Sequence, residues 1–482
     1  MNCVNPVFRY SRPARRMIYV ADMSGATRAA NERLSRLLVE VGWSPYDLAR
    51  RINHELGAGY VHRTTPYTWC RLGTTPRPPL PSVVTGLLAR AAGRPIRTSD
   101  LWPAVEDHLA VLPADQGLNV TGEDDWQARL PEDVESTMDS ADLMCISGSS
   151  LLAFIRRWRP RNPSEPRARS VTLTDSGDDP ILDHLAVSLS RLRTIDDRAT
   201  GGALLAVVAH QQRLLAQLAV REGGASTTAY RYLELLAQHC QLAGWLSMDL
   251  GDQARAQRNF LLGLRLAQFV GDDDLASLIA SCLAVQSLGR GALSEAHSLA
   301  QEATRGHHTP STAAILWMRR GRMGAAVGDA EDADGSFVRA REFLDVADSA
   351  PRQPWAYWLT PEILGAERGR SLVDLGRPHV AQSKLARVMT RQVISGRDRV
   401  LYGAALAQAH VGAGDLGQAC DELHRAAMQL PTTSSQRCRD LVLGVATDLA
   451  SRRLPASYRD LVSAARHATT AANDEGARGL RA

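Results

Sequence analysis

The sequence predicts an all-α protein that has a small helical bundle near its N-terminus and an α-solenoid of helical repeats after it. Leu and Ala dominate the 44% of hydrophobic residues, and aromatic residues make up only 5%. Leu and Ala favour helices because both lose little side-chain entropy there. Apolar residues recur at helical spacing from residue 31 onward, and glycines recur at a regular interval between residues 251 and 414. Both patterns are typical of packed helices.

The chain is expected to contain five segments. In order they are an unstructured tail, a helix-turn-helix bundle, an acidic then basic linker, a repeat domain and a second unstructured tail: 1–27, 28–103, 104–178, 179–470 and 471–482. The apolar stretch that follows the first arginines is too short for a signal peptide. We find no run of about 20 apolar residues, which a membrane helix needs. We therefore expect a cytoplasmic protein that has no membrane partner.

Charge separates the bundle from the linker. Residues 28–97 hold eleven arginines against four acidic residues, and residues 104–150 hold eleven acidic residues against Arg129 alone. A basic stretch, 151–170, follows. This pattern is typical of a solvated, flexible linker after a basic domain. Alternatively, the acidic segment competes with nucleic acid for a basic surface.

The first helix of the bundle is expected within residues 31–43. Its apolar residues have the spacing of one buried helical face: Leu34, Leu37, Leu38 and Val41. Two further helices begin with an N-cap followed by proline at the first helical position. These start signals are Ser44-Pro45 and Thr65-Pro66, and Gly73 ends the third helix.

The third helix has the features of a recognition helix, the one that enters the major groove in helix-turn-helix proteins. Its tip is polar and basic, and Trp69 is expected to pack inward. The candidate DNA-binding residues are Arg63, Thr64, Thr65, Tyr67, Thr68 and Arg71. Because helical bundles of this shape also bind proteins, a docking domain without DNA is the alternative.

Five glycines set the phase of the repeats: Gly251, Gly291, Gly328, Gly376 and Gly414. Their spacings are 40, 37, 48 and 38 residues, so the unit is near 38. Seven residues before each glycine stands a small residue: Gly244, Ala284, Gly321, Gly369 and Ala407. Five residues after each glycine stands an alanine: Ala256, Ala296, Ala333, Ala381 and Ala419. Nine residues after each stands an apolar one: Phe260, Ala300, Phe337, Leu385 and Leu423.

This order of small and bulky residues is the tetratricopeptide pattern in a slightly lengthened unit. Stacked helix pairs of this kind form a curved array that binds peptides or protein segments. One unit is about ten residues longer than the others, and the excess holds Trp355, Tyr357 and Trp358. These aromatic residues are candidates for a partner- or ligand-binding pocket. The alternative is that they fill a gap between lengthened helices.

Three stretches carry a resemblance to a known family. GWSPYDLARRIN, HRTTPYTWCRLGTTPRPPLP and GRPIRTSDLW resemble the N-terminal module of a group of actinobacterial regulators, distant relatives of phage-repressor-type helix-turn-helix proteins. Members join this module to a tetratricopeptide-like array, and they include streptomycete negative regulators of sporulation and antibiotic production. The resemblance covers residues 31–103 well and the array loosely. It implies transcriptional regulation.

No motif indicates an enzyme, a cofactor or a metal site. GAGDLG (412–417) matches the dinucleotide-binding motif, but a helical pattern precedes it where a strand is required. The pairs His307-His308 and His239-Cys240 lack partners at metal-ligand spacing, and the cysteines show no CxxC. We expect reduced, structural thiols.

Two hypotheses follow. In the first, the bundle binds DNA and the array senses a peptide, protein or small molecule. If the protein is a homodimer, two bundles bind DNA together. In the second, the protein is a tetratricopeptide-like interaction scaffold that does not bind DNA and acts by sequestering a partner. The charge of the bundle favours the first.

Overall fold

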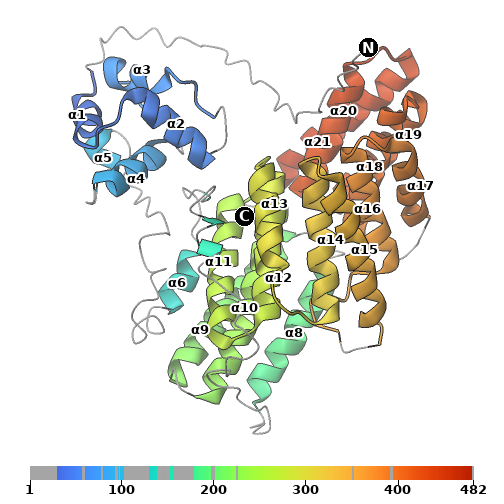
Figure 1. The fold of residues 1–482 in the computed structure, drawn as a ribbon, viewed down its shortest axis with the longest axis horizontal. Coiled ribbons are helices and arrows are strands. Elements are labelled where there is room, and N and C mark those ends of the chain that lie inside the picture. Colours follow the sequence, from blue (N-terminus) through green and yellow to red (C-terminus); the bar gives the residue numbers. More distant parts are fainter. Residues whose placement is uncertain are drawn as a thin grey trace. The chain divides into compact units, whose positions relative to one another are not determined.

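The computed structural model confirms the all-α fold (Figure 1). It describes residues 30–56, 60–76, 80–92, 96, 98–102, 130–137, 145, 151–152, 154–155, 179–196, 201–223, 226–349, 352–390 and 394–479. Every regular element in these ranges is a helix. The chain divides into two compact units at residue 111. The predicted tail 1–27 lies outside the described residues.

Five helices make up the N-terminal unit: α1 (Glu32–Glu40), α2 (Pro45–Leu56), α3 (Thr65–Leu72), α4 (Leu80–Ala92) and α5 (Thr98–Leu101). The predicted apolar face of α1 is buried at Leu34, Leu37 and Leu38. Val41 is only partly buried because α1 ends before it. The unit is therefore held by the helical face that the spacing of leucines indicates.

The start of α1 ties three helices together through Asn31. The Asn31 side chain accepts a hydrogen bond from the Leu34 amide at 3.0 Å and donates one to the Leu101 carbonyl at 2.8 Å. Its backbone amide donates to the Cys70 carbonyl at 2.9 Å. One residue therefore caps α1 and holds it against the ends of α3 and α5.

The helix starts agree with the sequence at α2 and differ by one residue at α3. The Ser44 hydroxyl accepts from the Asp47 amide, and the Asp47 carboxylate accepts from the Ser44 amide, which is the reciprocal capping arrangement. In α3 the N-cap is Thr64, and the predicted N-cap Thr65 is already helical. The Thr64 hydroxyl pairs with His62 Nδ1 instead of capping the helix.

The second unit contains α6 (Leu130–Ser136), α8 (Pro180–Asp196) and α9 (Gly201–Arg221), followed by helical hairpins. The hairpins are α10/α11 (Thr227–Asp249, Gln253–Val270), α12/α13 (Asp273–Gly289, Leu293–Ala303), α14/α15 (Pro310–Ala326, Ala330–Ala347), α16/α17 (Pro361–Asp374, Pro378–Met389), α18/α19 (Gly396–Ala413, Leu416–Met428) and α20/α21 (Gln436–Ala450, Ala456–Gly479), with the short η1 (Leu430–Thr432) before the last. The first helices of successive hairpins contact one another and form a continuous layer.

The five predicted turn glycines all lie between the two helices of a hairpin. Each has a positive φ: +90° at Gly251, +78° at Gly291, +83° at Gly328, +69° at Gly376 and +87° at Gly414. L-residues with a Cβ suffer a steric clash in this left-handed region, whereas glycine does not. The repeat phase is thus confirmed at every turn.

The predicted close approach of the paired helices is confirmed at the three positions that are glycine. A Cβ added to Gly244 would lie 2.5 Å from the Phe260 ring, and one added to Gly321 would lie 2.8 Å from the Phe337 ring. In the fourth hairpin a Cβ on Gly369 would lie 2.8 Å from Leu385 Cγ. A small residue on the first helix therefore receives a bulky side chain from the second.

Part of the predicted linker belongs to the core of the array. Leu130 and Val134 of α6, together with Leu151 and Ile155, are buried in the same hydrophobic cluster as α8 and α9. Glu135 of α6 pairs with α9 at 2.6 Å. The prediction of a solvated linker over 104–178 is therefore wrong for these stretches, because their apolar side chains join the hydrophobic cluster of the array. The remainder lies outside the described residues.

Two further expectations need correction. The helix α21 continues through residues 471–479, for which the sequence predicts an unstructured tail. Residues 202–221 of α9 are long and apolar enough to cross a membrane by length and composition, contrary to the expectation of no such run. Half of that segment is buried, and Gln212 within it donates to Asn259 at 2.9 Å. These contacts are those of a packed core helix.

We predict that Gly321→Ala destabilises the protein by about 1–3 kcal/mol, because its Cβ overlaps the Phe337 ring and the tight core must shift. The matched control is Gly335→Ala in the same hairpin, where a Cβ meets nothing within 4 Å. That variant should gain up to about 1 kcal/mol from helix propensity alone. Urea unfolding of both variants measures the difference, and an equal change in the two would contradict the packing.

Candidate functional site

The predicted recognition helix presents a polar face to solvent. Pro66, Trp69 and Cys70 of α3 are buried, with Trp69 only 4% exposed. The candidate residues lie on the other side. Exposed side chains are Arg63, Thr64, Tyr67, Thr68 and Arg71, and Thr65 is half-buried. The structure therefore brings all six together at the tip and outer face of one helix.

The segment before α3 is fixed by Asn53 of α2. The Asn53 side chain accepts from the Val61 amide at 2.8 Å and donates to the Val61 carbonyl at 2.9 Å. The Asn53 side-chain amide thus satisfies both the backbone N–H and the carbonyl of Val61, which holds this segment in a single position. Arg63 follows two residues later, so its backbone is placed by a contact that the sequence pattern did not reveal.

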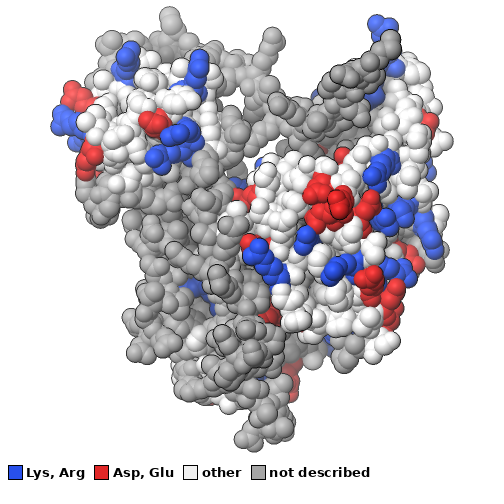
Figure 2. Space-filling view, in the orientation of Figure 1, with Lys and Arg blue, Asp and Glu red and all other residues white. Residues whose placement is uncertain are grey.

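Arg63 and Arg71 differ from other arginines of this unit in their partners. Arg36 pairs with Glu32 at 2.8 Å, and Arg50 pairs with an aspartate of α2 at 3.2 Å. Among the residues that the structure describes, no carboxylate pairs with Arg63 or Arg71. Figure 2 shows basic side chains on the visible face of this unit. Two guanidinium groups on one exposed face can therefore meet an external anion.

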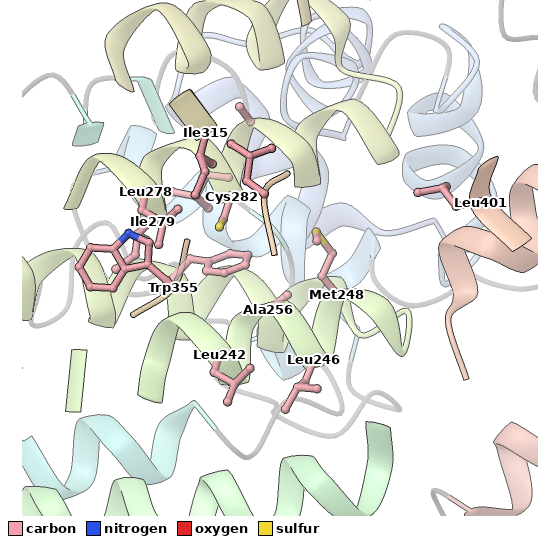
Figure 3. Packing of buried hydrophobic residues seen from close by; sticks show 14 of the residues in the cluster. Leu242, Leu246, Met248, Ala256, Leu278, Ile279, Cys282, Ile315, Trp355 and Leu401 are labelled. Carbon is pink, nitrogen blue, oxygen red and sulfur yellow. The ribbon is translucent and has the colours of Figure 1, made fainter. Parts of the chain in front are cut away.

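The three aromatic residues of the lengthened unit do not form an open pocket. Trp355 is 4% exposed, and its indole donates to the Thr312 hydroxyl at 3.3 Å. It lies near Leu278 and Ile279 in the packed cluster (Figure 3). The prediction that it contacts a ligand is corrected: burial assigns it to filling the space between α12 and the loop before α16.

The other two aromatic residues have separate surroundings. Trp358 is half-buried and packs against the hydrophobic core. Tyr357 is 41% exposed, and its hydroxyl donates to the backbone carbonyl of Arg193 in α8 at 2.8 Å. The loop therefore holds the end of α8 against the array, which favours the interpretation that these aromatics fill a gap.

A cluster of ion pairs joins the first and last hairpins, and no sequence pattern indicates it. Arg397 at the start of α18 lies 2.9 Å from Asp249 at the end of α10 and 2.9 Å from Asp196 at the end of α8. Arg437 of α20 approaches Asp249 at 2.6 Å. These four residues, which we call the clasp, are up to 241 positions apart in the chain. No local spacing could have related them.

The charges of the clasp depend on one another. Burial raises the pKa of Asp249, but Arg437 and Arg397 outweigh burial and hold it below its ordinary value of 3.8. Burial raises the pKa of Asp196, and the Asp249 charge adds to that rise against the attraction of Arg397. A buried carboxylate of this kind is stable as an anion only while its cationic partners remain in place.

His239 and Cys240 are both buried in the core of the array. Among the described residues no group of three His, Cys, Asp or Glu could hold a metal ion. His239 is buried between the Leu235 carbonyl and Gln211, and burial lowers its pKa to about 4. Burial raises the pKa of Cys240 to about 12, which leaves an unreactive thiol. Gly414, in the GxGxxG match, ends a helix.

Comparison with known proteins concerns the N-terminal unit. The family model described as the SP15 N-terminal domain matches residues 34–101, from within α1 to the end of α5. No curated protein and no solved structure matches the chain. The similarity agrees with these helices being one module, and it leaves the function to the geometry of the site.

We predict that Asp249→Asn costs about 3–5 kcal/mol of unfolding free energy, because it removes the buried anion that Arg397 and Arg437 both contact. The control is Asp345→Asn, which breaks an exposed pair with Arg341 and should cost about 0.5 kcal/mol or less. Since the folded pKa of Asp249 is lowered, its contribution is complete above pH 3.8 and is lost as the pH falls through the folded pKa. The deficit of the variant should therefore shrink in acid. A deficit that is constant with pH would contradict this assignment.

We predict that Trp355→Ala loses about 3–5 kcal/mol of stability, as expected for a large side chain removed from a packed core. Trp355→Phe should lose clearly less, because the ring still fills most of the space. Thermal and urea unfolding measure both. Unchanged stability of the alanine variant, together with altered binding of a partner, would restore the pocket hypothesis.

Proposed function

We propose that this protein is a DNA-binding transcriptional regulator whose helical repeat array binds a peptide, protein or small-molecule partner. The observation that supports the proposal most is the outer face of α3, where Arg63 and Arg71 lie exposed beside hydroxyl groups. DNA affinity arises mainly from cations that meet phosphates, and side chains at a helix tip contact base edges.

In this proposal α3 enters the major groove with its N-terminal end first. Tyr67 and Thr68 face outward on the first turn, where they can reach base edges or sugar and phosphate oxygens. Arg63 precedes the helix and Arg71 follows two turns later, so the two cations flank the polar residues. Thr65 is half-buried, so less of its side chain is open to contact than at Tyr67 and Thr68.

The array is the part proposed to sense the partner. The helix α8 stands between the DNA-binding unit and the hairpins in the sequence, and the clasp ties its end to α10 and α18. A partner that changed the relation of these helices would therefore act on the helix that precedes the hairpins in the sequence. An interaction scaffold without DNA affinity remains the second candidate, favoured by the array alone.

We predict that the double variant Arg63→Gln, Arg71→Gln loses about tenfold or more of the affinity for duplex DNA, because it removes two exposed cations. A mobility-shift titration with a pool of random-sequence duplexes at several salt concentrations measures both affinity and its salt dependence. The slope of log affinity against log salt should fall by about 0.9 for each phosphate that the variant no longer neutralises.

The matched control is Arg36→Gln, Arg50→Gln, which removes the same charge from the same unit. Both of these arginines pair with a carboxylate, so the loss of affinity should be much smaller. Equal losses in the two double variants would leave only a general charge effect and contradict the site. Wild-type protein that shows no salt-sensitive DNA binding would favour the scaffold.

A further inference from the structure

The layer formed by the first helices of the hairpins contains a buried arginine that no described carboxylate neutralises. Arg319 of α14 is 6% exposed. Its Nη1 donates to Ser281 Oγ at 2.6 Å, to Cys282 Sγ at 3.2 Å and to the Leu278 carbonyl at 3.4 Å, all on α12. Within the described part of the chain, no acidic side chain lies at ion-pair distance. A buried charge with only neutral partners costs stability. We therefore expect such a residue to have a function.

One edge of this guanidinium is unused. Three acceptors surround Nη1, but no described residue accepts from Nε or Nη2, and neither nitrogen is fully enclosed. In the neighbouring Arg320 the same edge of the guanidinium binds a carboxylate. Arg320 donates from Nε and Nη2 to Asp332 at 2.9 and 2.6 Å. The Nε–Nη2 edge of Arg319 has the same donors in the same fork, which matches a carboxylate.

A second donor lies beside it. The Arg319 guanidinium lies 5.5 Å from the ring centroid of Trp245 on α10, and the Arg437 guanidinium lies 4.8 Å from the same centroid. The Trp245 indole N–H has no hydrogen-bond acceptor among the described residues, and it is not fully enclosed. An indole N–H that is removed from bulk water normally finds an acceptor. The indole N–H therefore belongs to the ring that the Arg319 guanidinium faces.

The local charges indicate a monoanion. Arg437 and Arg397 are balanced by Asp249 and Asp196 in the clasp. Arg319 has no carboxylate at ion-pair distance among the described residues, and one negative charge would balance its own. A carboxylate supplies that single charge on two oxygens, whereas a phosphate group carries close to two charges at neutral pH.

We propose that Arg319 and Trp245 form a binding site for the carboxylate group of the array's ligand, such as a small organic acid or the C-terminus of a peptide. That the carboxylate belongs to the ligand that the array senses rests on the proposed function. Binding of a carboxylate at this site does not require that the protein binds DNA. Because Arg319 belongs to α14 and Trp245 to α10, a bound carboxylate would connect the third hairpin to the first, next to the clasp.

The test compares the thermal unfolding of the full chain in acetate, chloride and inorganic phosphate at equal ionic strength. Acetate should raise the wild-type Tm relative to chloride by about 2 °C when it exceeds its Kd about tenfold. Arg319→Met should abolish this rise, and Arg319→Lys, which keeps the charge but loses the fork, should reduce it. Peptides with free and amidated C-termini then separate the two sources of the carboxylate.

The matched control is Arg322→Met on the same helix, since Arg322 pairs with Asp374 at 2.5 Å. In chloride that variant should have a lower Tm than the wild type but keep the acetate response, whereas Arg319→Met should have an unchanged or higher Tm. An acetate response that survives in Arg319→Met, or no response in the wild type, would overturn the site. A response to phosphate alone would overturn the carboxylate assignment. None of these outcomes depends on whether the protein binds DNA.

Discussion

Three hairpins of the array depend on one close contact between their two helices. A glycine on the first helix faces a larger side chain on the second, and at Gly244 there is no space for a Cβ beside Phe260. This contact sets the distance between the paired helices, and the positive-φ glycine that follows sets the sharp turn between them. The stacking of successive hairpins, the layer of first helices and the position of the clasp all follow from this repeated geometry.

The sequence predicted the regular parts of this fold because their determinants are local. Turn glycines, the small and bulky positions and the apolar face of α1 each lie within one hairpin or one helix. The same holds for the candidate site on α3, whose burial pattern follows from the position of Trp69. Periodicity is sufficient wherever the residues that meet are separated by a fixed number of positions.

The parts that could not be predicted from the sequence involve contacts between distant residues. Asp196 and Arg397 meet only because the array brings the ends of α8 and α18 together. The buried state of Trp355 and of the short helix α6 has the same origin, since both fill spaces that exist only once the hairpins are stacked. An aromatic or apolar residue in an irregular segment can equally serve a pocket or a core, and only the three-dimensional packing distinguishes these roles.

The clasp has a consequence for how the array loses its structure. In an open repeat protein each unit contacts only its neighbours, so the terminal repeats can fray while the middle remains folded. Here the end of α10 is bound to the starts of α18 and α20, and α8 is bound to α18. Separation of the first hairpin from α18 and α20 must therefore break contacts near both ends of the array. The array is expected to unfold as one cooperative unit, so that a change at one end reaches the whole domain and not only the adjacent hairpin.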